Sequence, residues 1–169
     1  MTNTAQIQSK LFHQRHALIP LIKQWKKEKK KIVFTNGCFD IMHLGHVDYL
    51  SKAKDLGDVL IVGLNSDCSV KKLKGENRPI CDQKSRMHLL ASLFFVDAVV
   101  IFEEETPLKL IQEIVPDILV KGGDYKAEDV VGYNIVKENG GKIVILELIK
   151  GYSTSSIEQK ILEQFQKKL

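Results

Sequence analysis

Short β-branched runs alternate with segments of helical periodicity along most of this chain, and this alternation restricts the possible folds more than any other feature. The runs expected to form buried strands are residues 31–37, 58–65, 97–102, 117–123 and 142–148. The segments with apolar residues at helical spacing are 46–57, 82–94, 106–115, 127–140 and 153–165. This order predicts right-handed βαβ units and a parallel sheet covered on both faces. We therefore expect an α/β fold, a single Rossmann-like doubly wound domain with about five parallel strands.

The first 30 residues lack a strand run and are mostly polar. Leu18, Ile22 and Trp25 stand at roughly helical spacing, which predicts one N-terminal helix on the edge of the domain. We therefore divide the chain into a helical extension, 1–30, and a domain, 31–169. The length of 169 residues agrees with the size of one domain, about 150 residues.

The charge pattern argues against nucleic acid as a partner. The formal net charge is +4, but the stretch 23–31 alone has six Lys and one Glu, so the remaining residues are close to neutral. A nucleic-acid binder spreads its basic residues over a binding face, so a solvated helix end is the better interpretation, and contact with a polyanion is the alternative.

Several other classes of protein are disfavoured by the sequence. No apolar run approaches the ~18 residues of a membrane span, and the first residues lack the apolar segment of a secretory signal. The three cysteines, Cys38, Cys68 and Cys81, are odd in number and have no metal-ligand spacing. We expect a cytoplasmic protein with reduced thiols, no membrane partner and no protein-bound metal site.

The segments after the predicted strands are the candidate ligand site, because ligands of such sheets bind beyond the carboxyl ends of the strands. Residues 35–46 read TNGCFDIMHLGH, where His43 and His46 stand three apart at the start of a helix. Free backbone N–H groups and the helix dipole attract anions there. Gly37 and Gly45 allow close approach, so we expect a phosphate site. A helix cap beside a surface histidine, or a metal pair lacking a third ligand, are the alternatives.

Three further segments lie at the same predicted edge of the sheet. Residues 65–78 form an expected flexible loop with Gly75 as a hinge, and its cations can neutralise a leaving pyrophosphate. In 121–125, a carboxylate can accept from ribose hydroxyls and a ring can flank a base or a sugar; a Gly-Gly turn with a solvent-facing Asp is the alternative. In 151–156, hydroxyls at a helix start are either a cap alone or an anion site. The residues that carry these interpretations are Lys71, Lys72, Lys74, Arg78, Gly123, Asp124, Tyr125, Ser153 and Thr154.

The motif HLGH resembles the HxGH signature of the nucleotidyltransferase superfamily, and GCFDIMHLGHVDYL resembles its cytidylyltransferase-like branch. Together with NSDCSVKKLKG, KGGDY and GYSTSSI, it resembles the D-glycero-β-D-manno-heptose 1-phosphate adenylyltransferase family from about Lys31 onward. In many bacteria that domain is fused to a sugar kinase, and a chain of this length resembles the stand-alone form. A serine, Ser155, stands where the related motif usually has a second threonine.

The resemblance implies AMP transfer from ATP to D-glycero-β-D-manno-heptose 1-phosphate, which yields ADP-heptose and pyrophosphate for lipopolysaccharide core biosynthesis. It implies catalytic roles for His43, His46, Lys71 and Lys74, with Mg²⁺ accompanying the ATP. The implied nucleotide-binding residues are Thr35, Gly37, Phe39, Gly45, Arg78, Gly123, Asp124, Tyr125, Ser153 and Thr154. We also expect a homodimer. The alternatives are a cytidylyltransferase for a phosphoalcohol such as glycerol 3-phosphate and a non-catalytic nucleotide-binding module.

Overall fold

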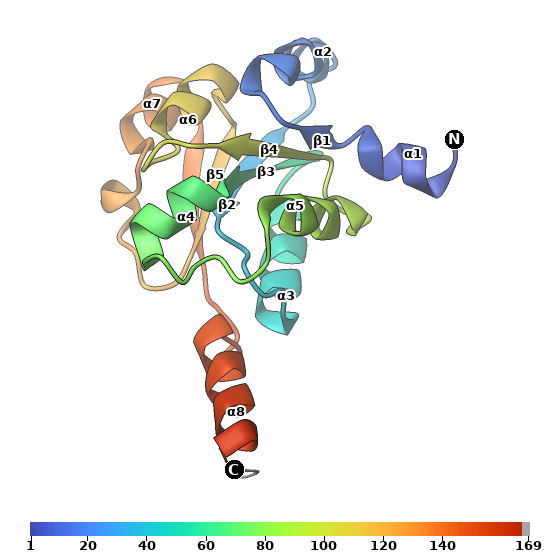
Figure 1. Ribbon diagram of the computed structural model, residues 1–169. Helices are drawn as coiled ribbons and strands as arrows, with labels where there is room; N and C mark the ends of the chain where they lie inside the picture. The colour runs from blue at the N-terminus through green and yellow to red at the C-terminus, as the bar shows by residue number, and fades with distance from the viewer. Residues whose placement is uncertain (167–169) are drawn as a thin grey trace.

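A computed structural model describes residues 1–166 and confirms the α/β fold, with one six-stranded sheet in which all the pairings are parallel. The strand order is β1-β4-β3-β2-β5-β6 (Figure 1). The strands are β1 (Leu11–Phe12), β2 (Ile32–Gly37), β3 (Val59–Asn65), β4 (Ala98–Phe102), β5 (Ile118–Gly122) and β6 (Lys142–Leu146). From β2 the chain adds β3 and β4 on one side and then β5 and β6 on the other. The crevice between β2 and β5 is therefore the switch point at which doubly wound sheets bind ligands.

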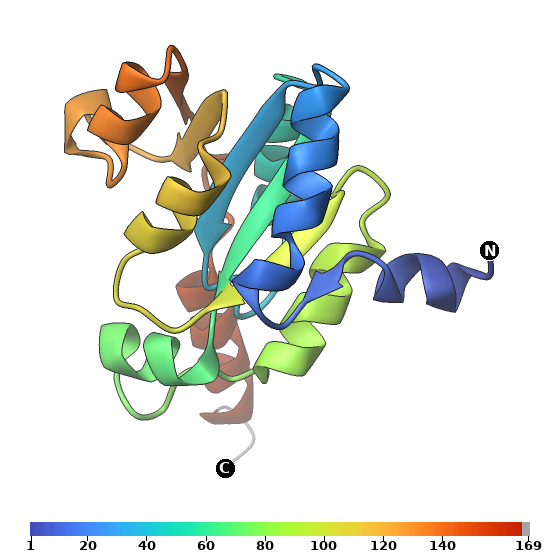
Figure 2. The same ribbon diagram turned by 90° about the horizontal axis from the view of Figure 1, so that it is seen from above.

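Helices cover both faces of the sheet, because both faces of the central strands carry apolar side chains. One face packs against α1 (Asn3–Gln8), α3 (Leu44–Lys54) and α5 (Gln83–Ser92), and the other against α2 (Ile19–Lys27), α6 (Leu108–Ile114) and α7 (Tyr133–Glu138) (Figure 2). Within β2, Phe34 lies in the core beneath α2 and Val33 in the core beneath α3. Each strand therefore supplies two cores, as expected for a buried parallel sheet.

The expected single N-terminal helix is wrong. Residues 1–30 instead form α1, the two-residue strand β1, a 3₁₀ turn η1 (Arg15–Ala17) and α2. Pro20 lies in the first turn of α2, where its missing N–H costs nothing. The main chain before η1 pairs with β4. The segment thus adds the sixth strand, which is too short to show a period of two in the sequence.

The lysine-rich segment after β3 is also more regular than expected, because most of it is a helix, α4 (Asp67–Lys74). Ser66 caps this helix by accepting a hydrogen bond from the backbone N–H of Ser69 at 3.1 Å. The buried side chain of Val70 anchors the helix on the sheet. Lys74 thus stands at a fixed helix end and not in a flexible loop.

The last two helices precede and follow β6 in the chain. The expected helix over 127–140 is interrupted by Gly132, whose φ of +92° breaks the helical path, so a short turn, η2 (Ala127–Asp129), precedes α7. Helix α8 (Thr154–Gln166) begins beyond β6 and extends away from the sheet (Figure 1). An ion pair between Arg78 and Glu158 joins α8 to the segment before α5.

Candidate active site

A two-part cavity lies at the switch point between β2 and β5, between the beginnings of α3 and α8. One part, about 250 Å³, is lined by the loop after β2, the end of β5 and Tyr125. The other, about 270 Å³, is lined by the first turns of α3 and α8. The residues shared by both parts are His46, Tyr49, Lys74, Leu148 and Thr154. The segments that were predicted to follow the carboxyl ends of the strands therefore meet in one site.

The two histidines of the HLGH motif are stacked against each other in this cavity. His43 is the N-cap residue of α3, and its ring centroid lies 3.8 Å from that of His46. The edge of the Phe39 ring packs on His46 at 5.2 Å. In the part of the chain that the structure describes, His43 Nδ1 and His46 Nδ1 are the buried side-chain nitrogen or oxygen atoms without a hydrogen-bond partner. A buried nitrogen without a hydrogen-bond partner is energetically unfavourable in a protein interior, unless a ligand forms the missing hydrogen bond.

Both histidines are neutral at pH 7 without a ligand. Burial, with the positive charge of Lys74 and the repulsion that a second protonated ring at His43 would add, lowers the pKa of His46 to about 4. Burial also lowers the pKa of His43. A neutral imidazole still has one N–H to donate, and a phosphate in the cavity would favour the protonated form. The metal-pair alternative gains no support, since no cluster of three His, Cys, Asp or Glu side chains within residues 1–166 could hold a metal ion.

Gly45 explains how the two rings fit above the start of α3. It is buried, and a Cβ added there would stand 3.1 Å from the His43 ring and 3.3 Å from Tyr152 Cβ. A methyl group would therefore push apart the imidazole and the α8 segment that face it. The glycine keeps the first turn of α3 open to a phosphate chain.

The hydroxyl-rich segment supplies a second helix start to the same cavity. Ser153 accepts a hydrogen bond from Ser156 N at 3.1 Å, and Ser156 Oγ accepts from Ser153 N at 3.2 Å. This reciprocal pair caps α8 and makes Ser153 its N-cap. Thr154 lines both parts of the cavity beside His46. The start of α8 and the two histidines therefore line the same cavity, an arrangement suited to a polyphosphate.

Most of the predicted site residues line the cavity, and five do not. Those that line it are Gly37, Phe39, His43, Gly45, His46, Lys74, Tyr125, Ser153 and Thr154. Those that lie outside its lining are Thr35, Lys71, Arg78, Gly123 and Asp124. Lys74, the last residue of α4, lines the cavity, whereas Lys71, three residues earlier, does not. Asp124 is exposed, and Gly123 turns the chain with a φ of +104°.

The expectation that Thr35 lines the pocket is wrong. Its side chain is fully buried, and its hydroxyl lies 2.6 Å from the Tyr49 hydroxyl, which in turn donates to Val120 O at 3.2 Å. Burial raises the pKa of Tyr49 to about 12, so this phenol stays protonated. Thr35 therefore fixes the ring of Tyr49, which lines the cavity.

The predicted phosphate contact of Arg78 is also not available in this structure. One nitrogen of its guanidinium lies 3.0 Å from the buried Asp40 carboxylate, and the other pairs with Glu158. Asp40 also accepts from Ile80 N and Cys81 N at 2.9 Å and 2.8 Å. Two carboxylates already neutralise Arg78, which links the loop after β2 to α8.

Sequence reasoning missed Arg86, a fully buried cation on the inner side of α5. Its guanidinium donates to Cys81 O at 2.9 Å, to Cys38 O at 2.6 Å and to Asp67 Oδ1 at 2.7 Å. These partners belong to three segments: the approach to α5, the loop after β2 and the start of α4. The sequence did contain a sign of this burial. Arg86 stands beside Met87 and four residues before Leu90, on the apolar side of a predicted helix.

Two polar residues of the cavity were missed as well, namely Lys121 and Asn36, at the ends of β5 and β2. Lys121 Nζ donates to Asn36 Oδ1 at 2.7 Å, and both side chains line the cavity. The only signal in the sequence was their position at the carboxyl ends of strands.

We expect the thiols to be dispensable for turnover. The three cysteines are free, Cys38 lines the cavity, and burial raises the pKa of its thiol, so it is protonated at pH 7. A variant with Cys38→Ser, Cys68→Ser and Cys81→Ser should keep kcat within about tenfold of the parent, or ~1.4 kcal/mol. A larger loss in a variant with an unchanged unfolding curve would show that a thiol takes part in the reaction.

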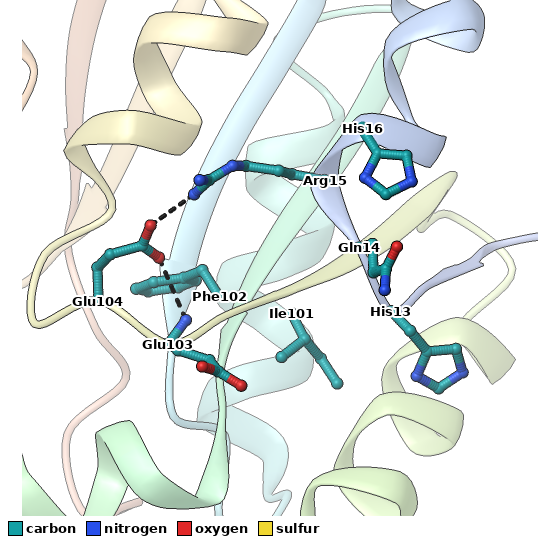
Figure 3. Close-up of a pocket in the computed structure, with 8 residues that line it drawn as sticks. All are labelled: His13, Gln14, Arg15, His16, Ile101, Phe102, Glu103 and Glu104. Atoms are coloured by element: carbon teal, nitrogen blue, oxygen red, sulfur yellow. Dashed lines mark hydrogen bonds and ion pairs between the residues drawn. The ribbon is translucent and has the colours of Figure 1, made fainter.

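A larger cavity of about 480 Å³ lies away from the histidines, between the segment before α2 and the end of β4. Arg15 is its central cation, and it is neutralised by Glu104 at 2.5 Å and Glu113 at 2.9 Å. Figure 3 shows the rings of His13 and His16 pointing away from this ion pair. With its cation already paired, this cavity is a weaker candidate for a phosphate ligand than the one between β2 and β5.

Residues 34–160 match the family model described as Cytidylyltransferase-like. The chain belongs to this cytidylyltransferase-like family. The match covers most of β2, both histidines and the start of α8, so it includes every residue that lines the cavity. It confirms the nucleotidyltransferase class and the Rossmann-like fold.

Individual relatives extend the comparison. The chain is 60% identical over 139 residues to the bifunctional protein HldE of Nitratiruptor sp., a match of 82% of this chain and 29% of the relative. It is 57% identical over 150 residues to HldE of Campylobacter jejuni subsp. doylei, covering 89% and 31%. The chain therefore spans about three-tenths of the length of these relatives.

Two solved structures are also similar. The lipopolysaccharide core biosynthesis protein from Thermoplasma volcanium is 34% identical, with a TM-score of 0.59, over 73% of this chain and 99% of that one. A pantoate-β-alanine ligase from Francisella tularensis, 19% identical with a TM-score of 0.57 over 90% and 77%, shares the fold. Within residues 1–166, no helix is long and apolar enough to span a bilayer.

Proposed function

We propose that this chain transfers AMP from ATP to D-glycero-β-D-manno-heptose 1-phosphate, releasing pyrophosphate and forming ADP-heptose for lipopolysaccharide core biosynthesis. Three observations support this: the four motifs in their order, the high identity to HldE proteins, and the similarity to a Thermoplasma protein of lipopolysaccharide core biosynthesis. The observation that carries the chemistry is the stacked pair of imidazoles, each with an unpartnered nitrogen, in a cavity that the start of α8 also lines.

The proposed reaction needs no protein nucleophile. An oxygen of the sugar phosphate forms a bond to the α-phosphorus of ATP, and the bond from that phosphorus to the bridging oxygen breaks, so pyrophosphate leaves with the electron pair. The attacking phosphate is already ionised, and no proton has to move. Positioning and charge stabilisation therefore account for the catalysis.

Different residues of the cavity would position the phosphates and stabilise the developing charge. His43 and His46 would donate to the triphosphate, with His46 at the α-phosphoryl group because it lines both parts of the cavity. Lys74 would neutralise charge on the leaving pyrophosphate. Thr154 and the N-terminus of α8 would bind the phosphates from the opposite side. Of Lys71, Lys74 and Arg78, which the sequence suggested for this task, Lys74 is the one that lines the cavity.

Mg²⁺ is proposed to arrive with ATP and not from a resident protein site. Among the residues that line the cavity, Asp40 is the one carboxylate, and Arg78 and two backbone N–H groups already occupy it. Mg²⁺ commonly keeps several waters and binds through substrate phosphates, which fits this lining. When bound, it supplies charge neutralisation of the polyphosphate.

A pyrophosphate-release assay tests the substrate assignment. ATP and CTP are each combined with heptose 1-phosphate or glycerol 3-phosphate, with and without Mg²⁺. We expect pyrophosphate when ATP, Mg²⁺ and heptose 1-phosphate are all present. Faster release from CTP with glycerol 3-phosphate would favour the cytidylyltransferase alternative. No release from any pair, with retained ATP binding, would favour the non-catalytic alternative.

We also propose a homodimer in the cytoplasm, where ATP is available. Ile161, Leu162 and Phe165 on α8 are large exposed apolar side chains that a second copy would cover. Light scattering tests the assembly, since a monomer mass near 19.2 kDa at micromolar concentration would contradict it.

A further inference from the structure

Lys121 is a cation without a carboxylate partner at the carboxyl end of β5. Its ammonium donates to the neutral Asn36 amide oxygen at 2.7 Å, and in the described part of the chain it forms no ion pair. The side chain is only partly exposed, and burial lowers its pKa. Removing an ammonium from water is unfavourable unless an opposite charge compensates it. The position therefore calls for an anion that comes from outside the chain.

The surroundings of Lys121 contain no free anion that could act as this partner. Asp40, the one carboxylate in the lining of the same part of the cavity, is already bound by Arg78, Ile80 N and Cys81 N. The other polar neighbours are uncharged groups or further cations, among them His46 and Lys74. This part of the cavity is therefore electropositive and fits a phosphate.

The two parts of the cavity indicate which phosphate this is. The part lined by His43, Gly45 and Ser153 has two helix N-termini and suits the β- and γ-phosphates of ATP. Lys121 is absent from that lining and faces the other part, which His46 and Lys74 join to the first. In an in-line displacement the attacking oxygen approaches opposite the leaving group. The acceptor therefore enters from the side of Lys121.

We propose that Lys121 binds the phosphate group of the acceptor sugar phosphate, while Asn36 holds its ammonium toward the cavity. This inference rests on the proposed adenylyl transfer and adds to it the residue that recognises the second substrate. The attacking oxygen and the departing pyrophosphate are then bound by different cations, Lys121 and Lys74. Lys121 touches substrate and is a catalytic residue in that sense.

The test is a comparison of steady-state constants for Lys121→Met and the parent. Met keeps the length of the stem and removes the charge. We expect KM for heptose 1-phosphate to rise about 10- to 100-fold, the usual effect of losing one charged hydrogen bond, while KM for ATP stays within about threefold. Lys121→Arg should recover part of the loss. The matched control is Lys126→Met, which removes an exposed lysine five residues away and should leave both constants unchanged.

Other outcomes would overturn the inference. A rise in KM for ATP without one for the sugar phosphate would place Lys121 on the triphosphate. Unchanged constants with a lower melting temperature would make it only a link between β2 and β5. If the parent chain itself shows no turnover, the proposed adenylyl transfer is wrong and the steady-state constants cannot be compared. Calorimetric titration of heptose 1-phosphate into parent and Lys121→Met, with the non-hydrolysable ATP analogue AMPCPP and Mg²⁺ present, then judges the binding separately, and equal affinities would contradict it.

Discussion

We expect His46→Ala to lower kcat and kcat/KM together by about 10²–10³-fold, or about 3–4 kcal/mol, the usual effect of losing one preorganised donor. His46 lines both parts of the cavity, and in the proposed reaction it donates where charge develops at the α-phosphoryl group. Its contribution therefore belongs to the transition state, and ATP should bind within a few-fold of the parent affinity. Steady-state kinetics and ATP titration measure the two quantities.

Two controls separate this effect from a loss of structure. The helix should persist, since Ala is a good helix former, so the melting temperature at pH 7 should change little. His46→Asn should recover part of the rate if its amide donates to the same oxygen. Unfolding of His46→Ala without a separate effect on kcat would make His46 a packing residue and remove the main group of the mechanism.

The pH dependence of stability provides a further readout for the same residue. The folded pKa of about 4 lies below the ordinary histidine value of 6.5, so between these values the unfolded chain binds a proton that the folded chain does not. Stability should therefore rise with pH across about pH 4–6.5, and His46→Asn should flatten this slope. An unchanged slope would contradict the buried, neutral state of His46.

We expect Arg86→Met to give the largest loss of stability, about 3–5 kcal/mol, because it leaves Asp67 and two carbonyls, of Cys38 and Cys81, without their donor. For a chain of this size that corresponds to a melting temperature lower by about 6–20 °C. Thermal unfolding followed by circular dichroism measures it.

Arg15→Met is the matched control for Arg86→Met. Arg15 also pairs with carboxylates, but its side chain is 36% exposed while that of Arg86 is 0% exposed. Exposed ion pairs contribute about 0–1 kcal/mol, so Arg15→Met should unfold within a few degrees of the parent. Equal losses for the two variants would show that Arg86 does not hold the three segments together.

The alternation of strands and helices could be predicted because buried parallel strands are almost wholly apolar, and β2 to β6 have this character. The strand β1 could not, because two residues show no period and its place is set by pairing with β4. Helix α4 was missed because its lysines suggest a loop, whereas the Ser66 cap and the buried Val70 decide the structure.

In the site, residues of local motifs were predicted well and residues placed by tertiary contacts were not. His43, Gly45 and His46 lie on one helix start, so spacing alone brings them together. Whether Thr35 or Lys121 faces the cavity depends on the path of the strand in which each one lies. Neither the hydrogen bond between Thr35 and Tyr49 nor the one between Lys121 and Asn36 is visible in the sequence.

The most direct test of adenylyl transfer follows the phosphates of ATP into the products. The chain is incubated with Mg²⁺, heptose 1-phosphate and ATP labelled with ³²P at either the α- or the γ-position, and the products are separated by chromatography. We expect the α-label in a sugar nucleotide with the mobility of ADP-heptose and the γ-label in pyrophosphate. Transfer of the γ-label to the sugar phosphate, or an α-label that stays in ATP or appears only as free AMP, would contradict the proposed reaction.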